Sequence, residues 1–190
     1  MFKLTILPGV GVTAYLGAAA QILSKGTLTA AGSILTVEAR HSAFLRAALS
    51  QLPFPQPFDV PLTLNEVFTL AAGFIVECPA DNPPLPVKAF PSLVLDPTTP
   101  SPIVGGQEIT ILTPGYELKP ADGSSPVFGA WITVTGPIFV DAVKVEGGFK
   151  LKVPAEVNGQ SYVVLTGCNE TVTDDTVAAG PAIVEVSFIH

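Results

Sequence analysis

Glu38 and His41 stand three residues apart in an Ala- and Leu-rich segment that we interpret as a helix. The apolar stripe of this helix passes through Leu28, Ala31, Ile34 or Leu35, Leu45 and Leu49. Glu38 and His41 fall on the same stripe, so one helical turn would present a carboxylate and an imidazole to a single metal ion. This spacing is typical of half of a dinuclear carboxylate centre, which binds iron or manganese.

The sequence does not supply the rest of such a centre. A complete centre needs a Glu from each of two helices and a Glu-x-x-His from each of the other two. The only other histidine is His190, and no acidic residue precedes Glu38. We therefore expect no catalytic residues and no resident cofactor. We favour a buried hydrogen-bonded pair of Glu38 and His41, assisted by Arg40 or Arg46, because unpaired burial is costly. A residual iron or manganese site on the same two side chains is the alternative.

The elements that carry these residues are predicted to be two helices. A first helix is expected from Thr13, as its N-cap, to about Ser24, with a Lys-Gly stop after it. A second helix is expected from Thr27 or Thr29 to about Gln51, where a Leu-Pro pair ends it. The turn between them is very short, so the two helices should form an antiparallel hairpin.

A Pro-rich segment follows the hairpin. So much Pro excludes a long helix or the interior of a sheet. One short helix is predicted near residues 63–75, because Thr63 and Glu66 have the spacing of a capping box. We expect the rest to be extended chain, anchored by Phe54, Phe58 and Phe90.

From about Gly105 the apolar pattern changes to a period of two. Turn signals, such as the one at residues 121–123, separate the strand-like segments. Strands are predicted at residues 107–113, 127–135, 138–145, 149–153, 161–166 and 182–189. Such a series describes a small antiparallel sandwich of immunoglobulin-like type. The predicted class is thus α+β, with a helical hairpin at residues 1–52, a connecting segment at 53–104 and a β-sandwich at 105–190.

Charge and composition exclude several classes of protein. Lys and Arg number 9 against 16 Asp and Glu, which gives a net charge of −7 and disfavours nucleic acid as a partner. Pro and Gly interrupt the uncharged N-terminal stretch, so we expect no transmembrane segment and no convincing signal peptide there. We expect a short lead-in and a buried helix in its place, with a cleaved signal peptide as the less favoured alternative.

Two further features bear on the compartment. Cys78 and Cys168 either form one disulfide or remain separate thiols, and we expect the bond. Asn169 opens an Asn-x-Thr triplet, which is a glycosylation acceptor if the protein is exported. Both features are compatible with secretion.

Several strings of residues resemble the fungal ferritin-like proteins of the stress-response and desiccation-related group. GVGVTAYLGAA at 9–19 is similar to their third helix, and AGSILTVEARH at 31–41 to their fourth. PFPQPFD at 53–59 and PVKAFP at 86–91 resemble the segment after their bundle. The resemblance implies the second half of a four-helix bundle, in which only Glu38 and His41 match metal-ligand positions. It also implies an extracellular or cell-wall location.

Three functions follow from these observations. The favoured one is a non-enzymatic structural or interaction protein, because half a bundle leaves apolar faces that another copy or partner helices could cover. The hairpin would then dimerise to rebuild a bundle, or pack on the sandwich. The second is residual metal binding through Glu38 and His41. The third is a carbohydrate-binding module on the sandwich, for which Tyr116 is a candidate and Trp131 is equally compatible with core or surface.

Overall fold

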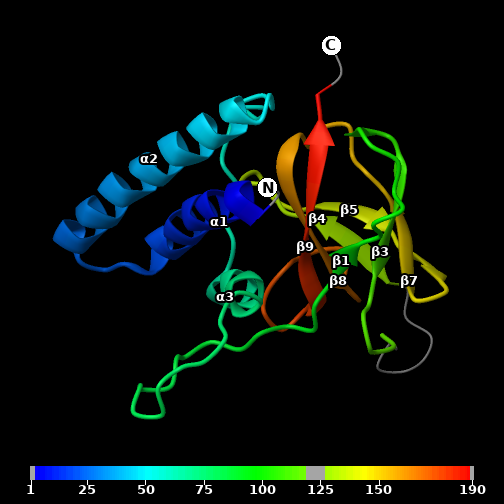
Figure 1. Ribbon diagram of the computed structural model, residues 1–190. Helices are drawn as coiled ribbons and strands as arrows, with labels where there is room; N and C mark the ends of the chain where they lie inside the picture. The colour runs from blue at the N-terminus through cyan, green and yellow to red at the C-terminus, as the bar shows by residue number, and fades with distance from the viewer. Residues whose placement is uncertain (1–2, 119–126, 189–190) are drawn as a thin grey trace.

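The computed structural model describes residues 3–118 and 127–188 and has the predicted α+β class. Three helices pack against one side of a β-sandwich (Figure 1). The predicted turn at residues 121–123, the end of the strand predicted to reach Ile189, and His190 lie outside the described residues.

The helical hairpin is confirmed, with different boundaries. Helix α1 spans Lys3–Ala18 and continues as the short 3₁₀ turn η1, Ala19–Gln21, and α2 spans Lys25–Ala48. The expectation that Thr13 is an N-cap was wrong, because its hydroxyl donates to the Val10 carbonyl inside α1 at 2.9 Å. The cap of α2 is Ser24, whose Oγ accepts from the Thr27 N–H at 3.3 Å.

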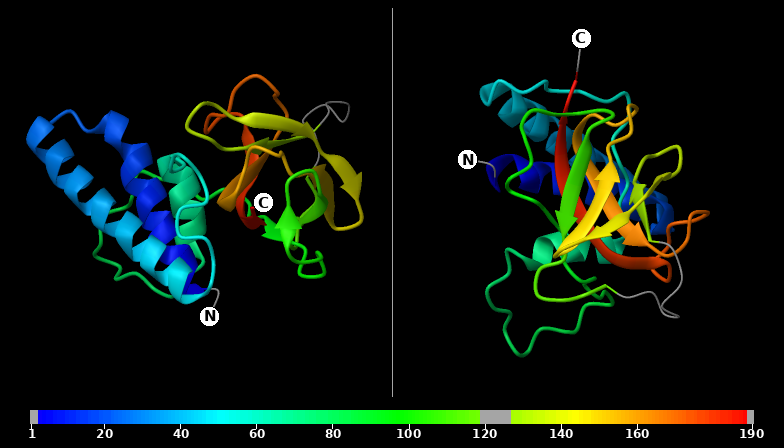
Figure 2. Two further views of the ribbon diagram at one scale, coloured as in Figure 1. Left: turned by 90° about the horizontal axis from the view of Figure 1, so that it is seen from above. Right: turned by 90° about the vertical axis from the view of Figure 1, so that its right-hand side faces the viewer.

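Helix α1 is the central one of the three helices. It packs against α2 on one side and α3 on another, and α2 is outermost (Figure 2). A Cβ at Gly17 would lie 1.8 Å from the Leu62 carbonyl oxygen, and one at Gly11 would lie 3.2 Å from the Glu38 carboxylate. These contacts require Gly at both positions or a shift of the neighbour. Because α1 is enclosed on several sides, its sequence is apolar without a clear polar face.

The Pro-rich segment is laid against the sandwich by Val60 and Leu62, which pack on Tyr162. Phe90 is half-buried against the sheet, as predicted. Phe54 and Phe58 are exposed, so the expectation that they anchor the segment was wrong. Near Phe54 and Phe58 it is the Pro55 ring that faces the sheet, where it lies against Gly159.

Helix α3, Leu64–Ala72, confirms the predicted short helix and its capping box. The Thr63 N–H donates to Glu66 Oε2 at 2.7 Å, and the Glu66 N–H donates to Thr63 Oγ1 at 3.2 Å. Glu66 is almost fully buried, and its Oε1 has no hydrogen-bond partner. Burial raises the pKa of this carboxyl, and the charge of nearby Asp174 adds to the effect.

The sandwich consists of two sheets. In order, the first contains β1 (Val94–Leu95), β3 (Glu108–Leu112), β7 (Gly148–Lys152) and β6 (Val143–Val145). The second contains β2 (Ile103–Val104), β9 (Val177–Ser187), β8 (Gly159–Thr166), β4 (Phe128–Trp131) and β5 (Ile138–Asp141). Strands β2 and β9 are parallel, so this sheet is mixed and not purely antiparallel as predicted. The Pro-rich segment contributes β1 and β2, both at sheet edges, where Pro is tolerated.

Strand β8 is buried on both faces. Val163 and Leu165 point into the sandwich interior, where they join Trp131 and Ile111 in the main core. Tyr162 points to the opposite side, where Val60 and Leu62 cover it. The helical part is therefore attached to the outer face of the second sheet, and this explains the unbroken apolar run in β8.

Candidate interaction surface

Glu38 and His41 do not form the buried pair that we expected. The His41 side chain is 61% exposed and that of Glu38 30%, with 3.9 Å between His41 Nδ1 and Glu38 Oε2, too long for a hydrogen bond. Glu38 turns toward Gly11 of α1. The buried residues of α2 are Ala31 and Arg46, and His41 is not among them.

The two side chains also do not fit a metal centre. In residues 3–118 and 127–188, no group of three or more His, Cys, Asp and Glu side chains is placed to hold an ion. Glu38 and His41 would supply two ligands, one of them in solvent. The dinuclear carboxylate centres with this motif need further carboxylates from other helices. We therefore derive no chemistry through a metal.

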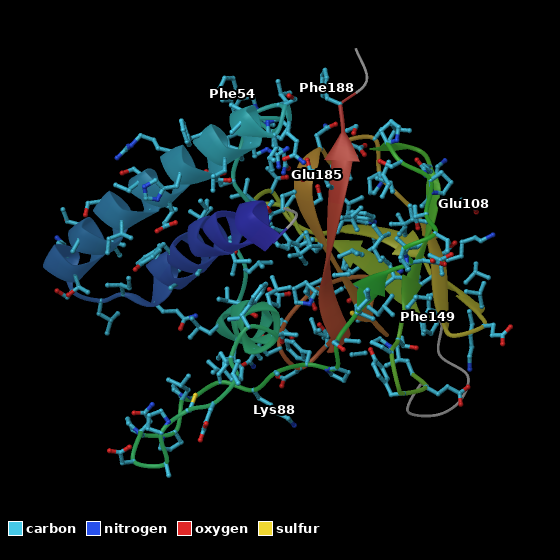
Figure 3. The ribbon with its side chains drawn as sticks, in the orientation of Figure 1. Phe54, Lys88, Glu108, Phe149, Glu185 and Phe188 are labelled. Atoms are coloured by element: carbon cyan, nitrogen blue, oxygen red, sulfur yellow. The ribbon has the colours of Figure 1, made fainter. Side chains whose placement is uncertain are left out.

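Arg46 attaches α2 to the sandwich. Its side chain is 6% exposed and makes a bidentate contact with Glu185 of β9, with Nη2–Oε1 at 2.6 Å and Nη1–Oε2 at 3.0 Å. Its Nε–H donates to the Leu52 carbonyl at 2.8 Å, which also fixes the chain after α2. Figure 3 shows Glu185 on β9, close to the C-terminal end of α2. Arg46 thus connects α2 to the sandwich and does not assist Glu38 and His41.

A groove of about 330 Å³ lies where the Pro-rich segment crosses α1, α2 and β8. Its lining includes Phe54, Phe58, Arg40 and Tyr162. The Tyr162 hydroxyl accepts from the Gln160 side chain at 2.7 Å, and burial raises the pKa of this phenol. The groove is thus a packing seam whose deepest polar group is already paired.

The predicted bond between Cys78 and Cys168 is absent from the structure, in which both are free thiols. Cys78 is exposed in the loop that projects beyond α3 (Figure 1). Cys168 follows β8, where the Glu170 N–H contacts its Sγ at 3.4 Å and lowers the pKa of the thiol. Asn169, the glycosylation candidate, is exposed beside it. Its modification remains a prediction.

The two aromatic residues considered for a carbohydrate site make other contacts in the structure. Trp131 is fully buried, and its indole N–H donates to the Lys152 carbonyl at 3.2 Å. Tyr116 is half-buried, its hydroxyl donates to the Ser92 carbonyl at 2.9 Å, and burial raises its pKa to about 12. Trp131 therefore has no ring face on which a sugar could stack, and the Tyr116 hydroxyl is already hydrogen-bonded.

The sequence reasoning predicted uncovered apolar faces on the hairpin but did not locate the second apolar face of α2. Phe44 is 74% exposed, and Ile34 and Val37, two to three turns earlier in the helix, are also exposed. We call the following residues the α2 stripe: Ala30, Ile34, Val37, His41, Phe44 and Ala48. Their alternating spacing of four and three residues is the available signal, because it places them on one helix face. The second face went unrecognised because Leu28 and Ile34 were assigned to the face against α1, whereas both are exposed.

Comparison with known families identifies the helical part alone. Residues 3–51 match the family model of the ferritin-like domain, and this range contains α1, α2 and the turn between them. The β-sandwich lies outside the match. No curated protein shows a significant match to the chain. Among the described residues, no helix is both long and apolar enough to cross a membrane.

Proposed function

We propose that this protein is a non-enzymatic interaction protein that associates with itself through its ferritin-like hairpin. In this proposal the β-sandwich is a stable base, and the hairpin displays α2 on its outside. The observation that carries the proposal is the exposed α2 stripe, in which Phe44 is 74% exposed and Ile34 and Val37 are 41% and 38% exposed. Contiguous exposed apolar surface of this kind marks interaction sites in soluble proteins.

Sedimentation equilibrium of the full chain from about 1 to about 200 µM tests self-association. We expect the average mass to rise with concentration, and Phe44→Glu to keep the protein monomeric over this range. The matched control is Thr36→Glu, which adds the same charge to another exposed position of α2. A monomer at every concentration would contradict the proposal.

The proposal places the protein outside the cell or at the cell wall, as in the fungal ferritin-like stress-related proteins that it resembles. Support comes from Asn169, which is exposed and therefore accessible to glycosylation. Secretion from a eukaryotic host should give a protein whose mass falls by one glycan in Asn169→Gln. An unmodified secreted protein, or one retained in the cell, would argue against this location.

The ferritin-like match keeps one alternative in view, which is binding of iron or manganese through Glu38 and His41. Elemental analysis of protein purified without chelator distinguishes the two functions. We expect less than stoichiometric metal, and no difference between the wild type and His41→Ala. One ion per chain that is lost in His41→Ala would replace our proposal with the metal-binding function.

A further inference from the structure

The partner of the α2 stripe can be argued from the order of its residues, on the premise of the proposed self-association. From either end, the stripe has Ala first, then a large apolar residue, Ile34 or Phe44, and then Val37 or His41. The positions of the stripe are symmetric about residue 39. Positions 30 and 48, 34 and 44, and 37 and 41 lie at equal distances on either side of it. We infer that the α2 stripe pairs in antiparallel orientation with the α2 stripe of a second copy, around a two-fold axis at residue 39.

This register matches the outer residues of the stripe, and it places Val37 opposite the partner's His41 on each side of the axis. Ala30 lies opposite the partner's Ala48 at each end, where small side chains let the two helices approach. Ile34 lies opposite the partner's Phe44, which buries the two largest side chains together. A two-fold interface requires such self-complementarity, because each surface must fit a copy of itself. The spacing of four and three residues is that of helices that interlock along a seam.

The Glu and Arg side chains of α2 are directed away from the stripe. Glu38 turns toward Gly11 of α1, Arg40 lines the groove under the Pro-rich segment, and Arg46 is bonded to Glu185. The seam can therefore close without burying an unpaired Arg or Glu side chain. Each copy has a net charge of −7, so added salt should strengthen the pairing by screening the repulsion between copies.

Orientation follows from the placement of the sandwich. The C-terminal end of α2 is attached to the sandwich, and its N-terminal end extends away from it (Figure 1). Antiparallel pairing therefore puts the two sandwiches at opposite ends of the seam, whereas parallel pairing would bring them to the same end. Antiparallel helices also place opposite ends of their dipoles side by side.

The seam is too small for a tight dimer. It runs about 27 Å along the helix and is about one helix wide, so it covers on the order of 300–400 Å² of each copy. A standard interface covers about 800 Å² per partner. We therefore expect a dissociation constant in the micromolar range or weaker, which suits reversible assembly.

Interchain disulfides test the register. In a background with Cys78→Ser and Cys168→Ser, one chain carries Ile34→Cys and a chain of different mass carries Phe44→Cys. Oxidation of the mixture should link the two kinds of chain, because the two positions face each other. Neither variant should link to itself, because its own positions lie about 15 Å apart along the seam, and a disulfide needs Cα atoms within about 7 Å. Thr36→Cys, on another face of α2, should give no link with any of them.

The outcomes separate this inference from the proposed function. A protein that stays monomeric in sedimentation overturns both. A dimer in which Ile34→Cys links to itself is parallel, and a dimer without links at these positions uses another surface. Either result overturns the register and leaves self-association standing. Ile34→Glu should raise the dissociation constant at least tenfold and Thr36→Glu less than twofold, with circular dichroism confirming that both variants are folded.

Discussion

The β-sandwich and the helical hairpin use their apolar side chains in opposite ways. In the sandwich, Trp131, Ile111 and Val163 are completely enclosed between two sheets. In the hairpin, Val10, Val12 and Ala31 are buried, but Leu28, Ile34, Val37 and Phe44 are exposed. The sandwich therefore encloses an apolar core of its own between its two sheets. The hairpin depends on contacts at its edges and leaves an apolar face of α2 exposed.

The largest expected difference between the two regions concerns their aromatic side chains. Trp131→Ala should lower the free energy of unfolding by about 3–5 kcal/mol, because it empties the centre of the sandwich and removes the bond to the Lys152 carbonyl. Phe44→Ala is the matched control on α2 and should change it by less than about 0.5 kcal/mol. Urea unfolding followed by circular dichroism measures both at a concentration where the protein is monomeric. Equal losses would show that the two regions are packed alike.

The joint between the regions should come next. Arg46→Ala leaves Glu185 beside the sheet without its partner, and breaking a buried ion pair typically costs 3–5 kcal/mol. Glu185 is 26% exposed, so we expect the lower end, about 3 kcal/mol. A double-mutant cycle with Glu185→Ala should give a coupling energy of at least about 1 kcal/mol.

The surface ion pair of Lys144 and Glu117 provides the control for that joint. Both side chains are more than half exposed. Lys144→Ala should therefore change stability by less than about 0.5 kcal/mol. If Arg46→Ala had as small an effect, α2 would be held to the sandwich by the Pro-rich segment and not by the ion pair.

The sequence predicted what local patterns determine. The capping box at Thr63 and Glu66 marks α3 because both of its bonds are made within four residues. Period-two alternation located the strands because each strand presents one side to the core. One of them, predicted over residues 138–145, divides into β5 and β6, which join different sheets.

What the sequence could not indicate depends on partners far along the chain. Arg46 and Glu185 are 139 residues apart, so no spacing rule pairs them. The predicted orientation of α2 about its own axis was wrong. This helix has two apolar faces, and only the position of α1 decides which of them is buried. The early start of α1 was missed for a similar reason, since its Gly residues looked like helix breakers, whereas Gly11 and Gly17 are points of close contact.

The close contact of α1 with the Pro-rich segment gives a third prediction. Gly17→Ala would place a Cβ 1.8 Å from the Leu62 carbonyl oxygen, so the helix or the segment must shift. We expect a loss of about 1–3 kcal/mol, as for other overpacked positions. A variant as stable as the wild type would mean that α1 is only loosely held there.

Gly32→Ala in α2 is the matched control, because a Cβ at this position would meet nothing within 4 Å. It should raise stability by about 0.5–1 kcal/mol, the usual gain of Ala over Gly inside a helix. Opposite signs for the two Gly-to-Ala changes would show that α1 is enclosed and this part of α2 is open.

The smallest predicted effect concerns Glu66, a buried carboxyl at the contact between the regions. Burial raises the pKa of Glu66 above its ordinary value of 4.5, so the folded protein favours the protonated form. This contribution to stability is present in full below pH 4.5 and is lost as the pH rises through the folded-state pKa. Glu66→Gln keeps the acceptor for the Thr63 N–H and cannot ionise. It should therefore match the wild type near pH 4 and exceed it by up to about 1 kcal/mol near pH 8.

Asp96 at the sandwich surface provides the opposite sign. Hydrogen bonds from Thr98 lower the pKa of Asp96, so its contribution is present above its ordinary pKa and is lost as the pH falls. Asp96→Asn should therefore be less stable than the wild type at neutral pH, and the difference should shrink in acid. Urea unfolding of both variants against the wild type at four pH values measures the two trends. The two differences in stability from the wild type could instead change in the same direction with pH. In that case the protonated Glu66 carboxyl would not be the form that the fold stabilises. The contact of α3 with the sandwich would then need another explanation.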